Sequence, residues 1–372
     1  MLRCNHLPLV AVFLVLALPA SAQTERYVNM GAPAGGDGTT NNVTGSTRAF
    51  ASLSEWEAAT QADLVSATAA SIVYLSCGST STLADTIAVT ISGWTTSAAY
   101  DITVDQAEAD NHAGVWSDSV YRLYTADATM LLISEDFVAF TGVQLGLHTT
   151  TSFLRGLQVD LILASNSIVF DRCIIRGPDN AQRCELFKNW DEDTILTLRN
   201  SLIYDAGQVE NSYGIESGGA TVTAQNVTVA NAWRGIIGYG TWIETNMLVT
   251  DCDGECWYNN ASHTRNYCAG DDATANEQGG TGNRDSQTFT FTDGYHLASN
   301  DAGARNFGTD LSGTFTVDID GETRPGESVW DIGADEYVPA ATPTPTPTPS
   351  PTPTPAAGGV APQMLHYKRL RT

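Results

Sequence analysis

The stretch Ala220-Thr221-Val222-Thr223-Ala224-Gln225-Asn226-Val227-Thr228-Val229 alternates apolar and polar residues on both sides of Asn226. Successive side chains of a β-strand point to opposite faces, so this pattern predicts two short strands joined by a one-residue kink. Asparagine suits the kink because it tolerates left-handed backbone geometry. The apolar residues of both strands are expected to face inward.

The same pattern recurs along the chain at intervals of about 20 to 30 residues, without amphipathic helices between the copies. A strand-rich repeat of this length predicts a solenoid that adds one turn per repeat. We expect asparagines at successive kinks to stack as a structural ladder, formed by Asn200, Asn226 and Asn246. The copies are Phe137–Leu145, Asn166–Ile175, Ile195–Ile203, Ala220–Val229 and Thr241–Val249, with their kinks at Gly142, Arg172, Asn200, Asn226 and Asn246.

Aligned on the kink, the copies share an apolar column four residues earlier and another three residues later. An antiparallel sandwich is the alternative architecture, but it needs hairpin turns every 8 to 12 residues, and such turns are sparse in this sequence. The sequence therefore predicts an all-β parallel solenoid. The earlier column is Val138, Ile168, Leu196, Val222 and Trp242, and the later one is Leu145, Ile175, Ile203, Val229 and Val249.

One helix is expected, over Ala49–Ala67. Ser52 and Glu55 form a capping box, and Leu53, Trp56 and Ala59 are placed on one face. A short amphipathic helix at the start of a solenoid can cap its open apolar end. The first strands are expected at Ile72–Leu75, Ile87–Ile91, Tyr100–Val104 and Met130–Ile133.

These features resemble the secreted right-handed parallel β-helix proteins of bacteria, the pectin-lyase-like group. The similarity rests on the Asn-centred repeats, the Ile72-Val73-Tyr74-Leu75 strand after a helix, and the ending Asp331-Ile332-Gly333-Ala334-Asp335-Glu336-Tyr337. It spans roughly residues 27–337. The resemblance implies the fold, but it does not specify an activity, because the group includes polysaccharide lyases, hydrolases and adhesins.

Composition limits the possible partners. The chain carries 18 Lys and Arg against 42 Asp and Glu, for a net charge of -24, and 42% of it is hydrophobic. An acidic chain without a basic face argues against nucleic acid and anionic membranes as partners. A local basic stretch, from Arg155 to Arg199, leaves acidic sugars possible as ligands.

The ends predict an exported protein. Residues 1–22 read as a signal peptide, with Arg3, an apolar run and an Ala20-Ser21-Ala22 cleavage site, so the protein is expected to be secreted or at the cell surface, without a transmembrane segment after signal removal. The β-helix domain is expected over residues 23–338. Residues 339–360 form a Thr/Pro-rich linker and residues 361–372 a short basic tail.

Cysteine usage fits export, because six cysteines remain after signal removal. Cys173 and Cys184 are predicted to form a disulfide. Two of Cys252, Cys256 and Cys268 could form another, and a Cys3His zinc site with His263 is the alternative for this cluster. Cys77 lies too many coils away to pair, so we expect a buried thiol there.

A second column precedes the repeats and is expected on an outer sheet face that binds an extended sugar polymer. Tyr213, Arg234 and Asp253 are expected to stack there, although paired charges on an ordinary solvated face are the alternative. The candidate catalytic residues are Glu216, Arg234, Asp253 and Glu255, since glycosidases need paired carboxylates. The candidate substrate-binding residues are Lys188, Trp190, Tyr213, Trp233, Tyr239 and Trp257.

Calcium is a possible cofactor. Asp318-x-Asp320-Gly321-Glu322 resembles the opening of a calcium loop, but Val329 stands where an EF-hand needs its glutamate. A turn before the final strand is the alternative role for this segment. The predicted function is carbohydrate binding, or a structural role, at a cell surface or in extracellular matrix, with an extracellular polysaccharide or cell-surface glycan as partner. The alternative is a polysaccharide lyase or glycoside hydrolase acting along the same face.

Overall fold

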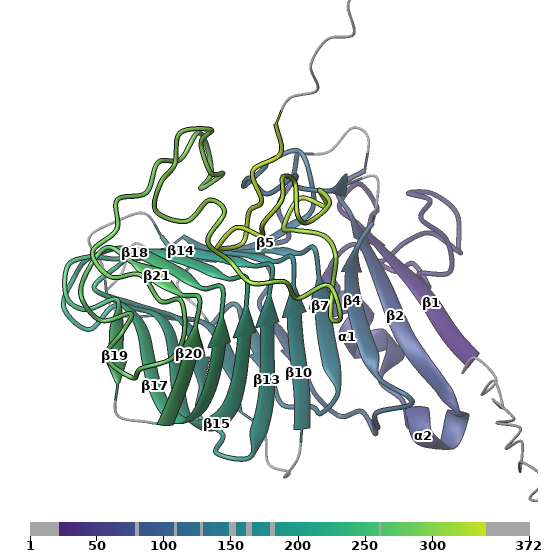
Figure 1. Ribbon diagram of the computed structural model, residues 1–372. Coiled ribbons are helices and arrows are strands. Elements are labelled where there is room, and N and C mark those ends of the chain that lie inside the picture. Colours follow the sequence, from purple (N-terminus) through teal and green to yellow (C-terminus); the bar gives the residue numbers. More distant parts are fainter. Residues whose placement is uncertain are drawn as a thin grey trace, which may run out of the picture. The chain divides into compact units, whose positions relative to one another are not determined.

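The computed structural model describes residues 22–78, 82–107, 110–126, 129–148, 154–160, 166–178, 183–259 and 262–339. The predicted signal peptide, apart from Ala22, lies outside these residues, as do the Thr/Pro-rich linker from residue 340 and the basic tail. All pairs between the named strands are parallel, and the chain winds through three sheet faces in turn (Figure 1). The predicted parallel β-helix is therefore confirmed.

The second face in chain order carries the predicted repeat. Its register aligns Val138, Ile168, Leu196, Val222 and Trp242, as the sequence columns predict. Its strands are β1 (Ala22–Asn29), β2 (Ala69–Ser76), β4 (Ile102–Gln106), β7 (Val138–Thr141), β10 (Asn166–Asp171), β13 (Thr194–Arg199), the second halves of β15 (Tyr213–Gln225) and β17 (Arg234–Thr245), and β20 (Ser262–Asn266).

The third face follows each kink. Its register pairs Leu145, Ile175, Ile203 and Val229 in one column, again as predicted. Its strands are β5 (Arg122–Ala126), β8 (Gln144–His148), β11 (Ile174–Arg176), β14 (Leu202–Gly207), β16 (Thr228–Ala232), β18 (Leu248–Cys252) and β21 (Ala269–Gly270).

The first face closes each coil, and most of it was not anticipated from the repeat. It runs parallel through strands that pair coil to coil and joins the second face within the long strands β15 and β17. Its strands are β3 (Val89–Ile91), β6 (Leu131–Ile133), β9 (Leu154–Val159), β12 (Cys184–Asn189), the first halves of β15 and β17, and β19 (Trp257–Asn259).

Every predicted kink has left-handed backbone geometry, with φ between 46° and 66° at Gly142, Arg172, Asn200, Asn226 and Asn246. The asparagine ladder is shorter than predicted. Asn246 Nδ2 donates to Asn226 Oδ1 at 3.2 Å, but Asn200 Nδ2 donates instead to Asp171 Oδ1. Asn226 Nδ2 donates to the carbonyl oxygens of Asp331 and Gly333, so the ladder also holds the C-terminal segment.

The predicted helix is two shorter ones, α1 (Leu53–Thr60) and α2 (Leu64–Ala67). Half of the predicted capping box is confirmed at its N-terminus. Ser52 Oγ accepts from the backbone N–H of Glu55, but Glu55 Oε2 accepts from the backbone N–H of Ala51 rather than from that of Ser52. Trp56 is buried and lies against Trp94, but Ala59 is exposed, which corrects its predicted place on the buried face. That the helices cap the solenoid stays a prediction.

One inward column changes from apolar to charged at its end. Phe140, Phe170, Leu198 and Ala224 are followed by Glu244, which is fully buried, and then by Arg265. Its carboxylate accepts from Trp257 Nε1, His263 Nδ1 and Arg265 Nε, at 2.8, 2.9 and 3.0 Å. Burial alone would raise the pKa of Glu244, but the hydrogen bonds from His263 and Arg265 and the Arg265 charge hold it below the usual value.

The C-terminal segment after β21 lies along the third face, where the green-to-yellow trace crosses the strands (Figure 1). Leu297 and Ile332 pack with Leu248 on one part of this face. Ile319 and Ala334 pack with Ile174 and Leu202 on another part. The C-terminal segment therefore covers the apolar side chains that project from the outer side of the third face. The predicted binding site is on the outer side of the first face.

Candidate functional site

A cluster of ion pairs lies on the outer side of the first face. Lys188 Nζ donates to Glu185 Oε2 at 2.6 Å and to Glu216 Oε2 on the next coil at 2.8 Å. Glu185 is also paired with Arg155 at 3.1 Å and with Arg183 at 3.2 Å. Parallel pairing of β9, β12 and β15 brings these groups together, because Arg155, Glu185 and Tyr213 share one register position.

The centre of this cluster is shielded from water. Only 3% of the Lys188 side chain is exposed, and its ammonium nitrogen lies 3.8 Å from the centre of the Trp190 ring. A desolvated cation on an aromatic face is held by the quadrupole of the ring as well as by its carboxylate partners. The ion pairs therefore fix the position of Trp190 from beneath.

Trp190 and Tyr239 form an exposed aromatic pair along the solenoid axis. Trp190 follows Asn189, which pairs with Ser217, so it is in line with Gly218, and Gly218 pairs with Tyr239. Trp190 is 47% exposed and Tyr239 39% exposed. Two strand spacings separate their backbones by about 10 Å. The residue between them, Gly218, has no side chain.

A second aromatic group lies at the start of strand β17. The Arg234 guanidinium carbon is 4.1 Å from the ring centre of Trp233 and 3.6 Å from that of Tyr258. Tyr213 pairs with Arg234 in register, as predicted, and its ring lies 6.2 Å from that of Trp233. The Arg234 guanidinium thus lies between two aromatic rings, an arrangement that its planar, delocalised charge favours.

Two predicted site residues lie elsewhere. Asp253 is exposed and does not join the column of Tyr213 and Arg234, because Ile236 pairs with Trp257 and this register puts Glu255 beside Arg234. The Arg234 Nε to Glu255 Oε2 distance is 3.8 Å. Trp257 is fully buried in the core and bonds Glu244, so it cannot stack on a ligand.

The four candidate catalytic residues are therefore not one constellation. Glu216 contacts Lys188, whereas Arg234 contacts Glu255 in the second aromatic group, and Asp253 is apart from both. The carboxylates that do converge are Glu185 and Glu216, since both accept from Lys188 Nζ. Glu185 was missed from the sequence because its role depends on register with the neighbouring coils.

The predicted Cys173–Cys184 disulfide is wrong. Both residues are buried thiols, and the Cys173 sulfur donates to the backbone carbonyls of Phe140 and Asp171. Cys173 lies at a kink while Cys184 begins β12 on the first face, so neighbourhood in sequence does not bring their sulfurs together. Burial raises the pKa of both thiols to about 12.

The Cys252, Cys256 and Cys268 group contains no disulfide, and it is not the alternative zinc site either. Cys256 contacts Cys252 and the Asp271 carboxylate, and the Cys252 hydrogen bond and burial raise the pKa of Cys256. Cys268 donates to the carbonyl of Asn266. His263 faces Glu244 in the core, because it lies in the inward column of the second face.

A cavity of about 280 Å³ was not anticipated. It lies beside the kinks of the early coils and is lined by Tyr74, Asp105, Asn111 and Arg172, among others. Burial raises the pKa of Asp105, and the Arg172 charge opposes this rise. The sequence signal was Arg172 itself, which stands at a left-handed position where the later repeats have asparagine.

Two groups of side chains in the C-terminal segment could hold a metal ion among the described residues. One is Asp318, Asp320 and Glu322, from the predicted calcium motif, and the other is His296, Asp320 and Asp335. Val317 and Thr323 form an antiparallel bridge, so the motif also makes the turn that was its alternative role. Burial, then hydrogen bonding to Asp320, raises the pKa of Asp318 to about 9.

Sequence comparisons do not assign the chain to a family. No protein-family model matches the chain, and no curated protein matches it significantly. Among solved structures, the chain is similar to the crystal structure of pectate lyase Pel9A, with 13% identity and a TM-score of 0.41 over 85% of this chain and 96% of that one. No helix in the described part of the chain is long and apolar enough to span a membrane.

Proposed function

We propose that the first face binds an extended polysaccharide whose sugar rings stack on Trp190 and Tyr239. The observation that carries this proposal is that these two exposed rings stand in line along the solenoid axis with Gly218 between them. Exposed aromatic rings present apolar faces that suit the C–H faces of sugars, and they lose little entropy on binding. A polymer lying along the axis can reach both rings.

The charges around the rings supply polar contacts. Arg155 and Arg183 are 35% and 40% exposed in their side chains and flank the buried Lys188. Their donors suit sugar hydroxyls and carboxylates, because guanidinium groups bind planar acceptors through two hydrogen bonds. Glu216 and Glu255 offer acceptors. This mixture favours a binding face that tolerates acidic sugars despite the acidic chain.

The partner is accordingly an extracellular polysaccharide or a cell-surface glycan, and the protein acts outside the cell. The predicted signal peptide supports this location. Cleavage of the polymer is the second candidate function, favoured by the convergence of Glu185 and Glu216 on one ammonium group. Two close carboxylates are what a glycoside hydrolase uses, but here both are paired with Lys188.

A panel of polysaccharides tests the proposal by affinity electrophoresis or calorimetry. Trp190→Ala is expected to weaken binding by about tenfold or more, since a buried aromatic contact contributes about 1–3 kcal/mol. Ile195→Ala is the matched control, because Ile195 is a similarly exposed apolar residue on the second face. Equal binding by both variants would exclude the first face, and release of reducing ends or unsaturated products would establish the enzymatic alternative.

A further inference from the structure

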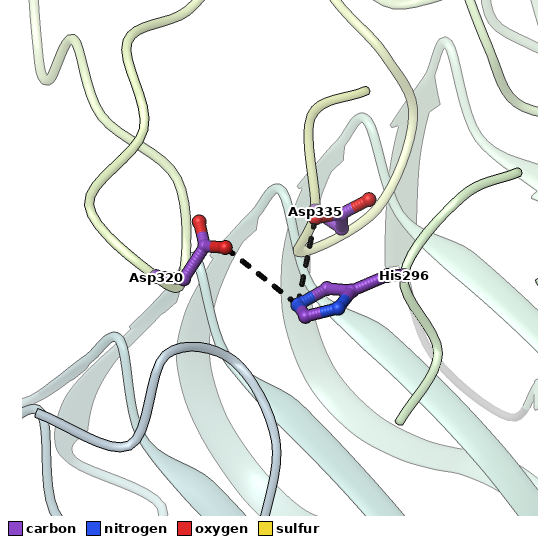
Figure 2. Close-up of side chains that lie close together, drawn as sticks. All are labelled: His296, Asp320 and Asp335. Carbon is purple, nitrogen blue, oxygen red and sulfur yellow. Dashed lines mark ion pairs between the residues drawn. The ribbon is translucent and has the colours of Figure 1, made fainter. Parts of the chain in front are cut away.

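We propose that His296, Asp320 and Asp335 bind one divalent transition-metal ion of the zinc class. Figure 2 shows that the carboxylates of Asp320 and Asp335 both approach one imidazole nitrogen of His296, which is Nε2. The three ligand atoms all lie within 4.8 Å of one another. This site is separate from the first face and does not depend on the proposed carbohydrate binding.

The distances fit ligands of one ion better than direct hydrogen bonds. His296 Nε2 lies 3.7 Å from Asp320 Oδ2 and 3.8 Å from Asp335 Oδ1. Both distances exceed hydrogen-bond length. Two ligand atoms each about 2.1 Å from a tetrahedral zinc ion lie about 3.4 Å apart, so small shifts would complete the site.

Polar atoms at the site lack other partners. His296 Nε2 is buried and has no hydrogen-bond partner within the described structure, and the buried Asp320 Oδ1 accepts no N–H or hydroxyl donor, its neighbour being the carboxyl group of Asp318. The Asp335 side chain is only 9% exposed, and its Oδ2 accepts from the backbone N–H of Leu297 at 2.7 Å, which leaves Oδ1 toward His296. Buried polar atoms without partners are costly, and a shared cation would satisfy them together.

The second ring nitrogen of His296 has the surroundings expected for a metal ligand. His296 Nδ1 lies 3.5 Å from the Asp293 carboxylate. A carboxylate near this nitrogen favours a proton on it, which would leave the lone pair of Nε2 available to a metal ion.

The ligand chemistry selects zinc over calcium. Imidazole is a ligand for zinc and other transition metals, whereas calcium takes oxygen ligands. In the neighbouring group, the Asp318 oxygens already accept from the backbone N–H groups of Glu322 and Glu336, at 2.7 and 3.1 Å. Asp318 thus stabilises the turn, and the calcium motif contributes Asp320 to a different site.

The proposed ion would join three separate parts of the C-terminal segment. His296 precedes Leu297, and Asp335 follows Ala334, both of which pack in the apolar layer on the third face. Asp320 follows Ile319, which belongs to the same cover. A shared ion would therefore crosslink three parts of the C-terminal segment. Its binding is expected to increase the stability of the folded protein.

The test uses the full chain, stripped with a chelator, dialysed and titrated with zinc chloride by calorimetry and thermal unfolding. One zinc ion is expected per chain, with a rise in Tm of several degrees that calcium chloride does not reproduce. His296→Gln is expected to abolish both effects. Glu322→Gln, in the neighbouring group, is the matched control and is expected to retain them.

An equal zinc response in wild type and His296→Gln would overturn the proposal, as would the absence of any zinc response. A calcium response lost in Glu322→Gln but kept in His296→Gln would assign the ion to the motif instead. Acylation of the wild-type histidines by diethylpyrocarbonate, read by mass spectrometry, needs no variant. Zinc should protect His296 but not the exposed His148, and equal labelling of both with and without zinc would also overturn the site.

Discussion

Lys188 donates to Glu216 on the next coil, with 2.8 Å between Nζ and Oε2, and its ammonium group is buried although it lies on the outer side of a sheet. Its cover is the ring of Trp190. The exposed aromatic surface and the buried ion pair are therefore one unit, in which the charges position the ring. This relationship connects the stability of the first face to its proposed binding role.

Lys188→Met is expected to destabilise the protein by about 3 kcal/mol, because breaking a buried ion pair leaves uncompensated carboxylates. Glu185 retains Arg155 and Arg183, which keeps the loss at the lower end of the usual range. Urea unfolding measures it. Arg305→Ala removes a more exposed pair with Glu327 and should cost about 1 kcal/mol or less, so equal losses would contradict the role of burial.

Asn226 is expected to show separate conformational and hydrogen-bonding contributions. Its φ is 52°, and its amide bonds Asn246, Asp331 and Gly333. Asn226→Gly keeps the left-handed backbone but loses these hydrogen bonds, which is expected to lower the free energy of unfolding by about 1–3 kcal/mol. Asn226→Ala should cost about 1 kcal/mol more, because alanine is strained there. Equal unfolding free energies for the two variants would contradict the strain argument.

His112 is expected to make the protein less stable in acid. Its Nδ1 accepts from the backbone N–H of Gly114, and its Nε2 donates to the Arg172 carbonyl at 2.8 Å, so a second proton would face a donor. Burial lowers the pKa of His112 to about 4. Because the histidine pKa is lower in the folded state, the unfolded chain takes up the proton at a higher pH as the solution is acidified. The contribution of His112 to the free energy of unfolding is therefore complete above pH 6.5 and declines toward pH 4.

The loss from His112 is about 3 kcal/mol over that window. His112→Gln, which keeps a donor and an acceptor but does not titrate, isolates it from other groups. The unfolding free energy of wild type minus that of the variant should fall as the pH drops from 6.5 to 4.5. A difference that is constant with pH would show that His112 titrates normally.

Thiol accessibility should follow burial. Cys252 is partly exposed, whereas Cys173 and Cys184 are buried with raised pKa values. Iodoacetamide is expected to label Cys252 in the native protein and the other two only after unfolding, since the thiolate is the reactive form. Peptide mass spectrometry gives the sites. Recovery of a Cys173–Cys184 crosslinked peptide would contradict the free thiols and support the disulfide predicted from the sequence.

The repeat was predictable because its signal is local. Inward positions at Val138, Ile168 and Leu196 recur at fixed distances from a kink, and a parallel β-helix requires that regularity within every coil. The first face was harder to predict because its coils differ in loop length. For this reason Asp253 was predicted at the register position beside Arg234, which Glu255, two residues later, occupies in the structure. Spacing along the sequence alone could not show this register.

The sequence by itself determined the parallel coils, their kinks and the column that faces the core, because alternation and left-handed backbone preference act over a few residues. Only the tertiary structure decided that Trp257 is internal, that Lys188 is buried, and that His296 meets Asp320 and Asp335. These outcomes depend on coil-to-coil register and on a C-terminal segment that returns to the third face. These particular contacts lie outside the repeat and leave no periodic trace in the chain, so only the folded arrangement reveals them.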